Sequence, residues 1–139
     1  MGSQPKKEIL GMISPEERAY LQEFARTEYS GEGAIVDLGC WLGASTIELA
    51  KGLRENPRTN AAASVVHAFD RFVWEAWMDQ FVAQMELKGR YQSGDSFYEE
   101  CLNRTRPWQE NIEFHPGDLT ALGWKGGPIE FLFIDAMKS

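Results

Sequence analysis

The sequence predicts an α/β fold in which a parallel sheet of about four strands is flanked by helices. Short apolar segments alternate along the chain with stretches whose apolar residues recur at helical spacing. The short segments are apolar on both faces, as the strands of a buried parallel sheet are. The chain has 139 residues, of which 43% are hydrophobic, so a single domain with its own core is expected.

The first expected helix begins at Ser14 and ends near Thr27. Ser14 can cap the helix, Pro15 suits the first helical position, and Glu17 completes a capping box. Residues 1–13, which precede this helix, are interpreted as an N-terminal tail or an expression tag.

The elements that follow alternate between strand and helix. Short apolar runs indicate the strands, and amphipathic spacing bounded by glycine or proline indicates the helices. The Trp-rich segment 72–85 has three interpretations: a helix face packed on the sheet, a lid over an aromatic or lipophilic ligand, or an oligomer surface. The predicted strands are 34–38, 64–69, 111–115 and 129–134, and the predicted helices after the first are 44–53, 72–85 and 96–104.

Composition and charge argue against several classes of partner. The net charge is −7 and the basic residues are scattered, so no nucleic-acid partner is expected. No stretch reaches about 18 consecutive apolar residues, so no membrane segment is expected. Two cysteines make no disulfide framework and no signal peptide is evident, so the sequence predicts a cytoplasmic protein.

The stretch AIVDLGCWLGASTIELA, residues 34–50, is the most informative motif. It predicts a strand, a tight loop from Gly39 to Gly43, and a helix whose first N–H groups face a ligand. The spacing G-x-x-x-G and the bulky Trp41 differ from the G-x-G-x-x-G fingerprint of dinucleotide sites, which argues against an NAD-dependent oxidoreductase. Asp37, at the end of the strand, suits a ligand that carries an ammonium or sulfonium charge.

Two further acidic residues follow predicted strands. Asp70 ends the second strand about 30 residues after the glycine loop, where a carboxylate can accept hydrogen bonds from a ribose diol. Asp118 follows the third strand after a Pro-Gly turn and could accept a hydrogen bond from an adenine amino group. The alternative for both residues is a turn without a ligand.

The histidines and Cys40 are interpreted as structural residues. His67 and His115 are the only two histidines in the sequence, and each lies on a predicted strand. Cys40 lies within the glycine loop, but the sequence specifies no base near it, so a nucleophilic role is not expected. The two cysteines and two histidines lack the spacing of a zinc site.

Together these residues resemble the class I S-adenosylmethionine-dependent methyltransferases. VDLGCWLGAS resembles the first motif of that family, Asp70 falls on its ribose-binding acid, and Gly117-Asp118-Leu119 falls on the segment that brackets the adenine. The resemblance implies a Rossmann-like domain over residues 14–139 that binds S-adenosylmethionine. The cofactor-binding residues that it implies are Asp37, Gly39, Trp41, Gly43, Ser45, Asp70, Asp118 and Leu119.

A narrower resemblance is to the macrocin O-methyltransferases, which modify natural products. SPEER, FDRF and FLFIDAMKS are similar to that group's pattern, and FIDAMK also resembles the cation-dependent catechol-type O-methyltransferases. In both groups the acid that corresponds to Asp135 binds a divalent cation, so the resemblance implies a Mg²⁺ ligand at Asp135. A helix cap or turn is the structural alternative. The activity implied is O-methylation of a hydroxyl on a small-molecule acceptor.

Class I methyltransferases continue after the fourth strand with strands that complete the acceptor site, whereas this sequence ends at Ser139. We therefore expect a fold that is incomplete at its C-terminus and carries the cofactor part. The rival hypothesis is a non-catalytic fragment, or a binding or assembly module. An exposed fourth strand also predicts pairing between copies, and hence a homo-oligomer.

Overall fold

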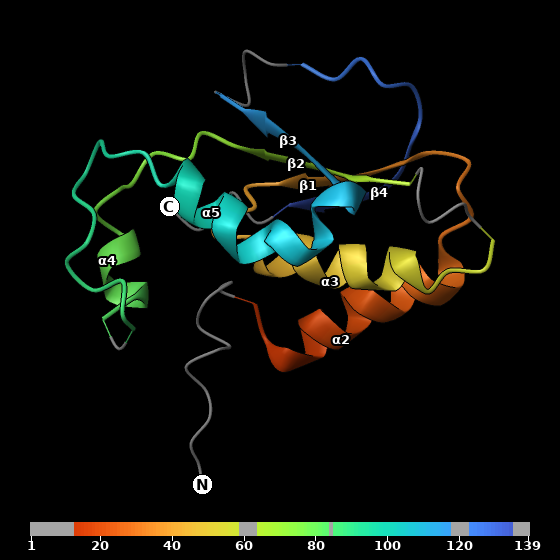
Figure 1. Ribbon diagram of the computed structural model, residues 1–139. Coiled ribbons are helices and arrows are strands. Elements are labelled where there is room, and N and C mark those ends of the chain that lie inside the picture. The colour runs from red at the N-terminus through yellow and green to blue at the C-terminus, as the bar shows by residue number, and fades with distance from the viewer. Residues whose placement is uncertain (1–12, 59–63, 84, 118–122, 135–139) are drawn as a thin grey trace, which may run out of the picture.

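The computed structural model describes residues 13–58, 64–83, 85–117 and 123–134, and its centre is a sheet of four parallel strands (Figure 1). The strands lie in the order β3-β2-β1-β4, with every neighbouring pair parallel. The carboxyl ends of the strands therefore lie along one edge of the sheet, which confirms the predicted fold class. The strands are β1 (Ala34–Leu38), β2 (Val66–Asp70), β3 (Ile112–Pro116) and β4 (Ile129–Ile134).

The main helices cover one face of this sheet (Figure 1). Phe24 stacks on Phe131 of β4 with ring centroids 4.3 Å apart, and Tyr98 contacts Phe114 of β3. In the part of the chain that the structure describes, the opposite face carries the segment 123–128 and no helix. The elements on the covered face are α2 (Pro15–Glu23), the π-helical turn η1 (Phe24–Glu28), α3 (Ala44–Arg54), α5 (Tyr98–Thr105) and the 3-10 helix η2 (Arg106–Asn111).

Helix α2 begins with the predicted capping box. The amide of Glu17 donates to Ser14 Oγ at 3.1 Å, and the amide of Ser14 donates to Glu17 Oε1 at 2.9 Å. Helix α2 then packs closely on α3, because Gly52 leaves room for it: a Cβ at that position would lie 2.4 Å from the carbonyl oxygen of Gln22. The approach of the two helices thus depends on a missing side chain.

The expected long helix over 72–85 is wrong, and among the described residues of this range α4 (Met78–Phe81) alone is helical. Phe72 has a φ of +58°, and Val73 forms an antiparallel bridge with Ser96. The amide of Trp74 donates to the Asp95 carbonyl at 2.7 Å instead of to a helical partner. The backbone after β2 therefore pairs with residues 94–97 and closes the segment 71–97 between β2 and α5, called the excursion below. Helix α4 of this segment lies beyond the carboxyl ends of the strands (Figure 1).

Strand β4 is the outermost strand of the described sheet next to β1. Glu130 secures it, because its carboxylate accepts hydrogen bonds from the amide and the hydroxyl of Ser30, both at 2.9 Å. On the face without helices, Leu132 and Ile134 remain 45% and 50% exposed. No helix in the described residues is long and apolar enough to cross a membrane.

Candidate functional site

The loop between β1 and α3 folds back over the end of β2. Its backbone is left-handed at Gly39 (φ +82°), Trp41 (φ +51°) and Gly43 (φ +96°), a conformation that glycine adopts without cost but that strains tryptophan. The amide of Gly39 donates to the carbonyl of Phe69 at 2.7 Å, and the amide of Gly43 closes the turn on Cys40 at 2.8 Å. The loop thus holds a strained shape against the neighbouring strand.

Asp70 joins three loops at the carboxyl edge of the sheet. Its Oδ2 accepts a hydrogen bond from the amide of Trp41 at 2.9 Å, and its Oδ1 accepts one from the amide of Phe72 at 2.8 Å. Its carbonyl accepts a further bond from the amide of Gly117 at 2.9 Å. Burial raises the pKa of the Asp70 carboxyl, although both backbone donors act to lower it. The loops after β1, β2 and β3 therefore meet at this residue.

Asp37 lies inside the protein rather than at its surface. Its side chain is 0% exposed, and its Oδ2 accepts hydrogen bonds from Ser45 at 2.7 Å and Thr46 at 2.8 Å. Burial raises its pKa to about 6, against the two hydroxyls that act to lower it. Its Oδ1 has no hydrogen-bond partner within the described part of the chain. Asp37 and Ser45 therefore fix the first turn of α3 to the end of β1.

Helix α5 supports the same loop from the side. A Cβ on Gly43 would lie 2.7 Å from Cγ2 of Thr105 and 3.6 Å from Sγ of Cys101, so only glycine fits there. Cys40 is 3% exposed, and burial together with the neighbouring Cys101 thiol raises its pKa well above its usual range. Both thiols are free of disulfides, and Cys40 carries its proton at neutral pH.

The side chain of Trp41 points into an aromatic cluster formed with the excursion after β2. Its ring centroid lies 6.4 Å from that of Trp74, 6.1 Å from Trp77 and 6.4 Å from Phe81, and the residue is 2% exposed. Trp74 is buried and Trp77 and Phe81 are partly buried, but they do not form the expected helix face on the sheet. They pack against the Trp41 ring of the glycine loop and not on the sheet. The lid and the oligomer surface stay predictions.

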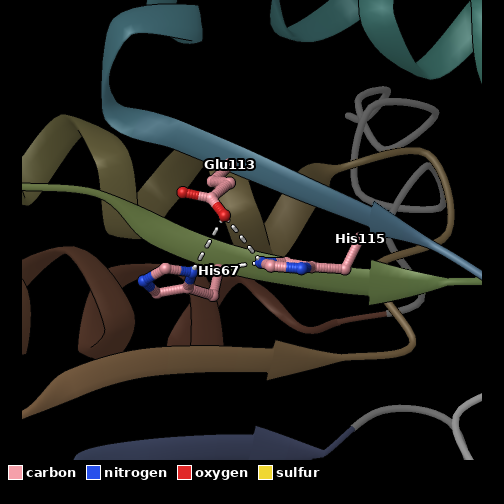
Figure 2. A group of neighbouring side chains, drawn as sticks. All are labelled: His67, Glu113 and His115. Carbon is pink, nitrogen blue, oxygen red and sulfur yellow. Dashed lines mark hydrogen bonds and ion pairs between the residues drawn. The ribbon is translucent and has the colours of Figure 1, made fainter. Parts of the chain in front are cut away.

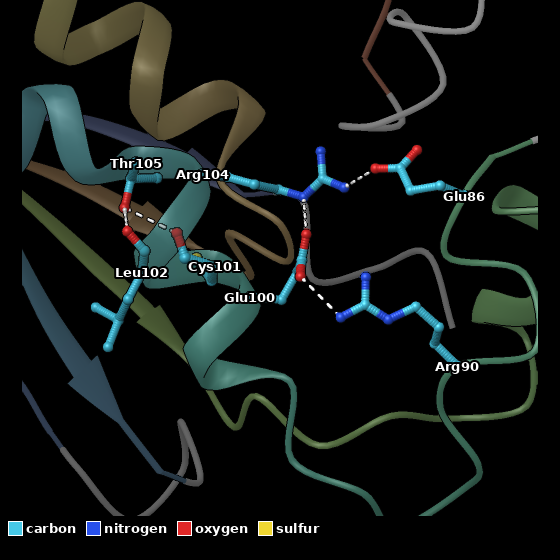
Figure 3. Close-up of polar contacts among 7 residues, drawn as sticks. All are labelled: Glu86, Arg90, Glu100, Cys101, Leu102, Arg104 and Thr105. Atoms are coloured by element: carbon cyan, nitrogen blue, oxygen red, sulfur yellow. Dashed lines mark hydrogen bonds and ion pairs between the residues drawn. The ribbon is translucent and has the colours of Figure 1, made fainter.

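An ion-pair network connects this excursion to α5 (Figure 3). Arg104 donates to Glu100 at 2.6 Å along the helix and to Glu86 of the excursion at 2.8 Å. Arg90 approaches the other oxygen of Glu100 at 3.5 Å. Thr105 donates to the Cys101 carbonyl at 2.9 Å and so keeps its methyl group against the glycine loop. The excursion and the loop are thus supported by one helix.

The predicted site residues separate into three groups. Gly39, Gly43 and Asp70 lie together at the carboxyl edge, whereas Asp37, Ser45 and the Trp41 ring are buried around them. Asp118, Leu119 and Asp135 lie outside the described residues. Thr46 and Thr105 were missed by the sequence interpretation, because nothing local indicates that a hydroxyl faces Asp37 or that a methyl faces Gly43.

A hollow of about 340 Å³ lies between α2, α3, α5 and η2, and Leu42 of the glycine loop is among the residues that line it. Leu42 and Ile47 supply its apolar wall, and Lys51 extends over the Trp108 ring at 5.5 Å from the centroid. Its position on the helical side places it apart from the junction at Asp70, which remains the candidate site on grounds of topology.

Comparison with known proteins identifies the fold. No protein-family model matches the sequence, and a search of curated proteins finds no match. Among solved structures, the O-methyltransferase NovP matches with a TM-score of 0.63 and 19% sequence identity, over 91% of this chain and 56% of NovP. The chain thus spans a little over half the length of that protein. The protein therefore has a Rossmann-like α/β fold, similar to the corresponding part of the O-methyltransferase NovP.

Proposed function

We propose that this domain binds S-adenosylmethionine and forms the cofactor-binding part of an O-methyltransferase. The observation that carries the proposal is the junction at Asp70, where the glycine loop, the end of β2 and the turn after β3 meet. In open α/β sheets, ligands bind in the crevice at the carboxyl ends of the strands. The similarity of fold to NovP agrees with this proposal.

The residues at the junction fit a nucleoside. A carboxylate offers about four lone-pair positions, and Asp70 uses two of them for the amides of Trp41 and Phe72. The remaining two can accept hydrogen bonds from the two hydroxyls of a ribose. Gly39 and Gly43 present backbone without side chains beside it, and their own amides are already bonded to the carbonyls of Phe69 and Cys40, which keeps the loop in this shape.

The other predicted residues have indirect or separate roles in this proposal. Asp37 and Ser45 are buried, so they contribute by holding the first turn of α3 in place. Asp118 and Leu119 would contact the adenine, and Asp135 would hold Mg²⁺ beside an acceptor hydroxyl, with the effect of lowering the pKa of that hydroxyl. The bound cofactor supplies an electrophilic methyl group, and the protein's part is to position it against a small-molecule acceptor.

Calorimetric titration tests the proposal directly. We expect the full chain to bind S-adenosylhomocysteine with one site and to give no heat with NAD⁺. Asp70→Asn replaces one ribose acceptor by a donor and should weaken binding at least about tenfold, the loss of a charged hydrogen bond. Asp95→Asn is the matched control, because Asp95 makes a similar carboxylate contact to the amide of Gln92 at 2.8 Å in the excursion.

Three results would overturn the proposal. The first is a folded sample that gives no heat with S-adenosylhomocysteine. The second is equal affinity of wild type and Asp70→Asn, with both proteins folded by circular dichroism. The third is binding of NAD⁺ in preference to S-adenosylhomocysteine, which would favour the alternative of a nicotinamide-dependent oxidoreductase.

A further inference from the structure

His67, Glu113 and His115 lie together on the face of the sheet opposite α3 (Figure 2). The register of β2 with β3 places His67 beside Glu113, and His115 follows two residues later, so all three side chains leave the same face. They are an imidazole, a carboxylate and a second imidazole, and Figure 2 shows their polar atoms turned toward one another. Both histidines of the chain are therefore at one place.

The distances between these atoms match those between ligands of one metal ion. His67 Nδ1 lies 3.1 Å from His115 Nε2, and Glu113 Oε2 lies 3.3 Å from His115 Nε2 and 4.0 Å from His67 Nδ1. Two atoms that each lie about 2.1 Å from a tetrahedral Zn²⁺ are about 3.4 Å apart. A small rotation of Glu113 toward His67, possible for a side chain that is 57% exposed, would shorten the longest of the three separations.

We propose that His67, Glu113 and His115 form a binding site for a divalent transition metal ion of the Zn²⁺ class. Two imidazoles and one carboxylate suit zinc and its neighbours, whereas Mg²⁺ prefers a set of oxygen ligands. Three protein ligands leave the fourth coordination position to water or to a substrate oxygen. The site is distinct from the Mg²⁺ ligand expected at Asp135, and it does not depend on the proposed binding of S-adenosylmethionine.

Aromatic neighbours orient the two imidazole rings before any metal arrives. The Phe69 ring stacks on His115 with centroids 4.3 Å apart and planes 9° from parallel. The Trp124 ring meets the edge of His67 at 5.1 Å and 76°. Trp124 is itself held in place, because its Nε1–H donates to the carbonyl of Gly127 at 2.6 Å. Ligands whose rings are already oriented lose less entropy when they bind an ion.

The site is open enough for an ion to enter. The side chains of His67 and His115 are 19% and 26% exposed, and Glu113 stands at the rim. In the described part of the chain, no helix lies over this face of the sheet (Figure 1). The net charge of −7 also favours the approach of cations.

The test is a titration of tag-free, chelator-treated full chain with Zn²⁺ in competition with a chromophoric chelator. We expect one ion per chain, a higher midpoint of thermal unfolding with Zn²⁺ than without it, and shifts of both imidazole signals in the NMR spectrum. Glu113→Gln and His115→Ala should each weaken binding at least about tenfold. Glu110→Gln is the matched control, because Glu110 is an exposed glutamate on η2 outside the cluster.

The exposed position of Glu113 keeps the test decisive even if a histidine variant does not fold. Stoichiometric Zn²⁺ binding by wild type that is weakened in folded Glu113→Gln and retained in Glu110→Gln would establish the site. Absence of stoichiometric binding, or equal affinity of wild type and Glu113→Gln, would overturn it. Neither result depends on S-adenosylhomocysteine, so the metal site and the proposed function succeed or fail separately.

Discussion

The amide of Trp41 and the carboxylate of Asp70 are joined by a 2.9 Å hydrogen bond across two neighbouring strands. The bond holds Trp41 at a φ of +51°, which is costly for any residue with a side chain. A strained backbone near a crevice is maintained only where its surroundings determine it, and such positions concentrate at ligand sites. The loop that we assign to the cofactor is therefore shaped in advance by the residue that we assign to the ribose.

Gly43 should tolerate no side chain while Thr105 keeps its methyl group. Alanine at 43 would meet Cγ2 of Thr105 at 2.7 Å and would carry a φ of +96°. We expect Gly43→Ala to lower the free energy of unfolding by roughly 3 kcal/mol, of which about 1–2 kcal/mol is backbone strain. Urea unfolding measures this loss. In the Thr105→Ser background, which removes the methyl group, the loss should shrink by about 1 kcal/mol, and an undiminished loss would refute the steric account.

Asp37 should make stability fall as pH rises from about 4 to 7. Its folded pKa is raised to about 6 from 3.8, so between these values the folded state binds more protons than the unfolded state. Asp37→Asn should remove a change of up to about 3 kcal/mol across this window. Urea unfolding at several pH values, compared with wild type and with Asp95→Asn, measures the difference. Parallel pH profiles of wild type and Asp37→Asn would contradict the assignment.

Arg104 should stabilise the excursion through Glu100 and Glu86. Its side chain and that of Glu100 are 19% and 13% exposed, so removal of the guanidinium leaves a carboxylate largely buried without this partner. We expect Arg104→Ala to cost roughly 2 kcal/mol and to speed amide exchange around Glu86. Arg106→Ala removes an exposed arginine of η2 and should cost less than about 0.5 kcal/mol. Similar losses in the two variants would argue against the network.

Strand β4 should mediate self-association, as the sequence predicts. It is the outermost strand of the described sheet, and an unpaired strand edge offers backbone donors and acceptors to a second copy. We expect a mass by light scattering that rises with protein concentration. Leu132→Lys should reduce this rise, because a lysine beside a strand edge opposes pairing. Gln109→Lys, on η2, is the control of equal charge, and a strictly monomeric wild type would refute the prediction.

The strands and the first helix could be predicted because local patterns determine them. Buried parallel strands appear as short apolar runs, and the capping box of Ser14 and Glu17 acts within one helical turn. The helix over 72–85 failed for the opposite reason. Its apolar spacing suits a helix, but the left-handed Phe72 and the pairing of Trp74 with Asp95 redirect the backbone. Such pairing depends on residues far along the chain.

The sequence predicted which residues belong to the candidate site, but it did not predict how their side chains pack. Glycine spacing indicated the loop, and strand ends indicated Asp70. The direction of the Trp41 ring toward Trp77, and the burial of Asp37, depend on packing that no spacing expresses. His67 and His115 were interpreted separately as structural, because only the register of two strands brings them together.

That register gives the histidine cluster a consequence for folding. Side chains alternate between the faces of a strand, so a slip of β3 by one residue would turn Glu113 and His115 toward α3 and leave His67 alone. An ion held by all three side chains would be compatible with one alignment only. Metal supplied during refolding would therefore stabilise the correct pairing of β2 and β3 and not a pairing shifted by one residue.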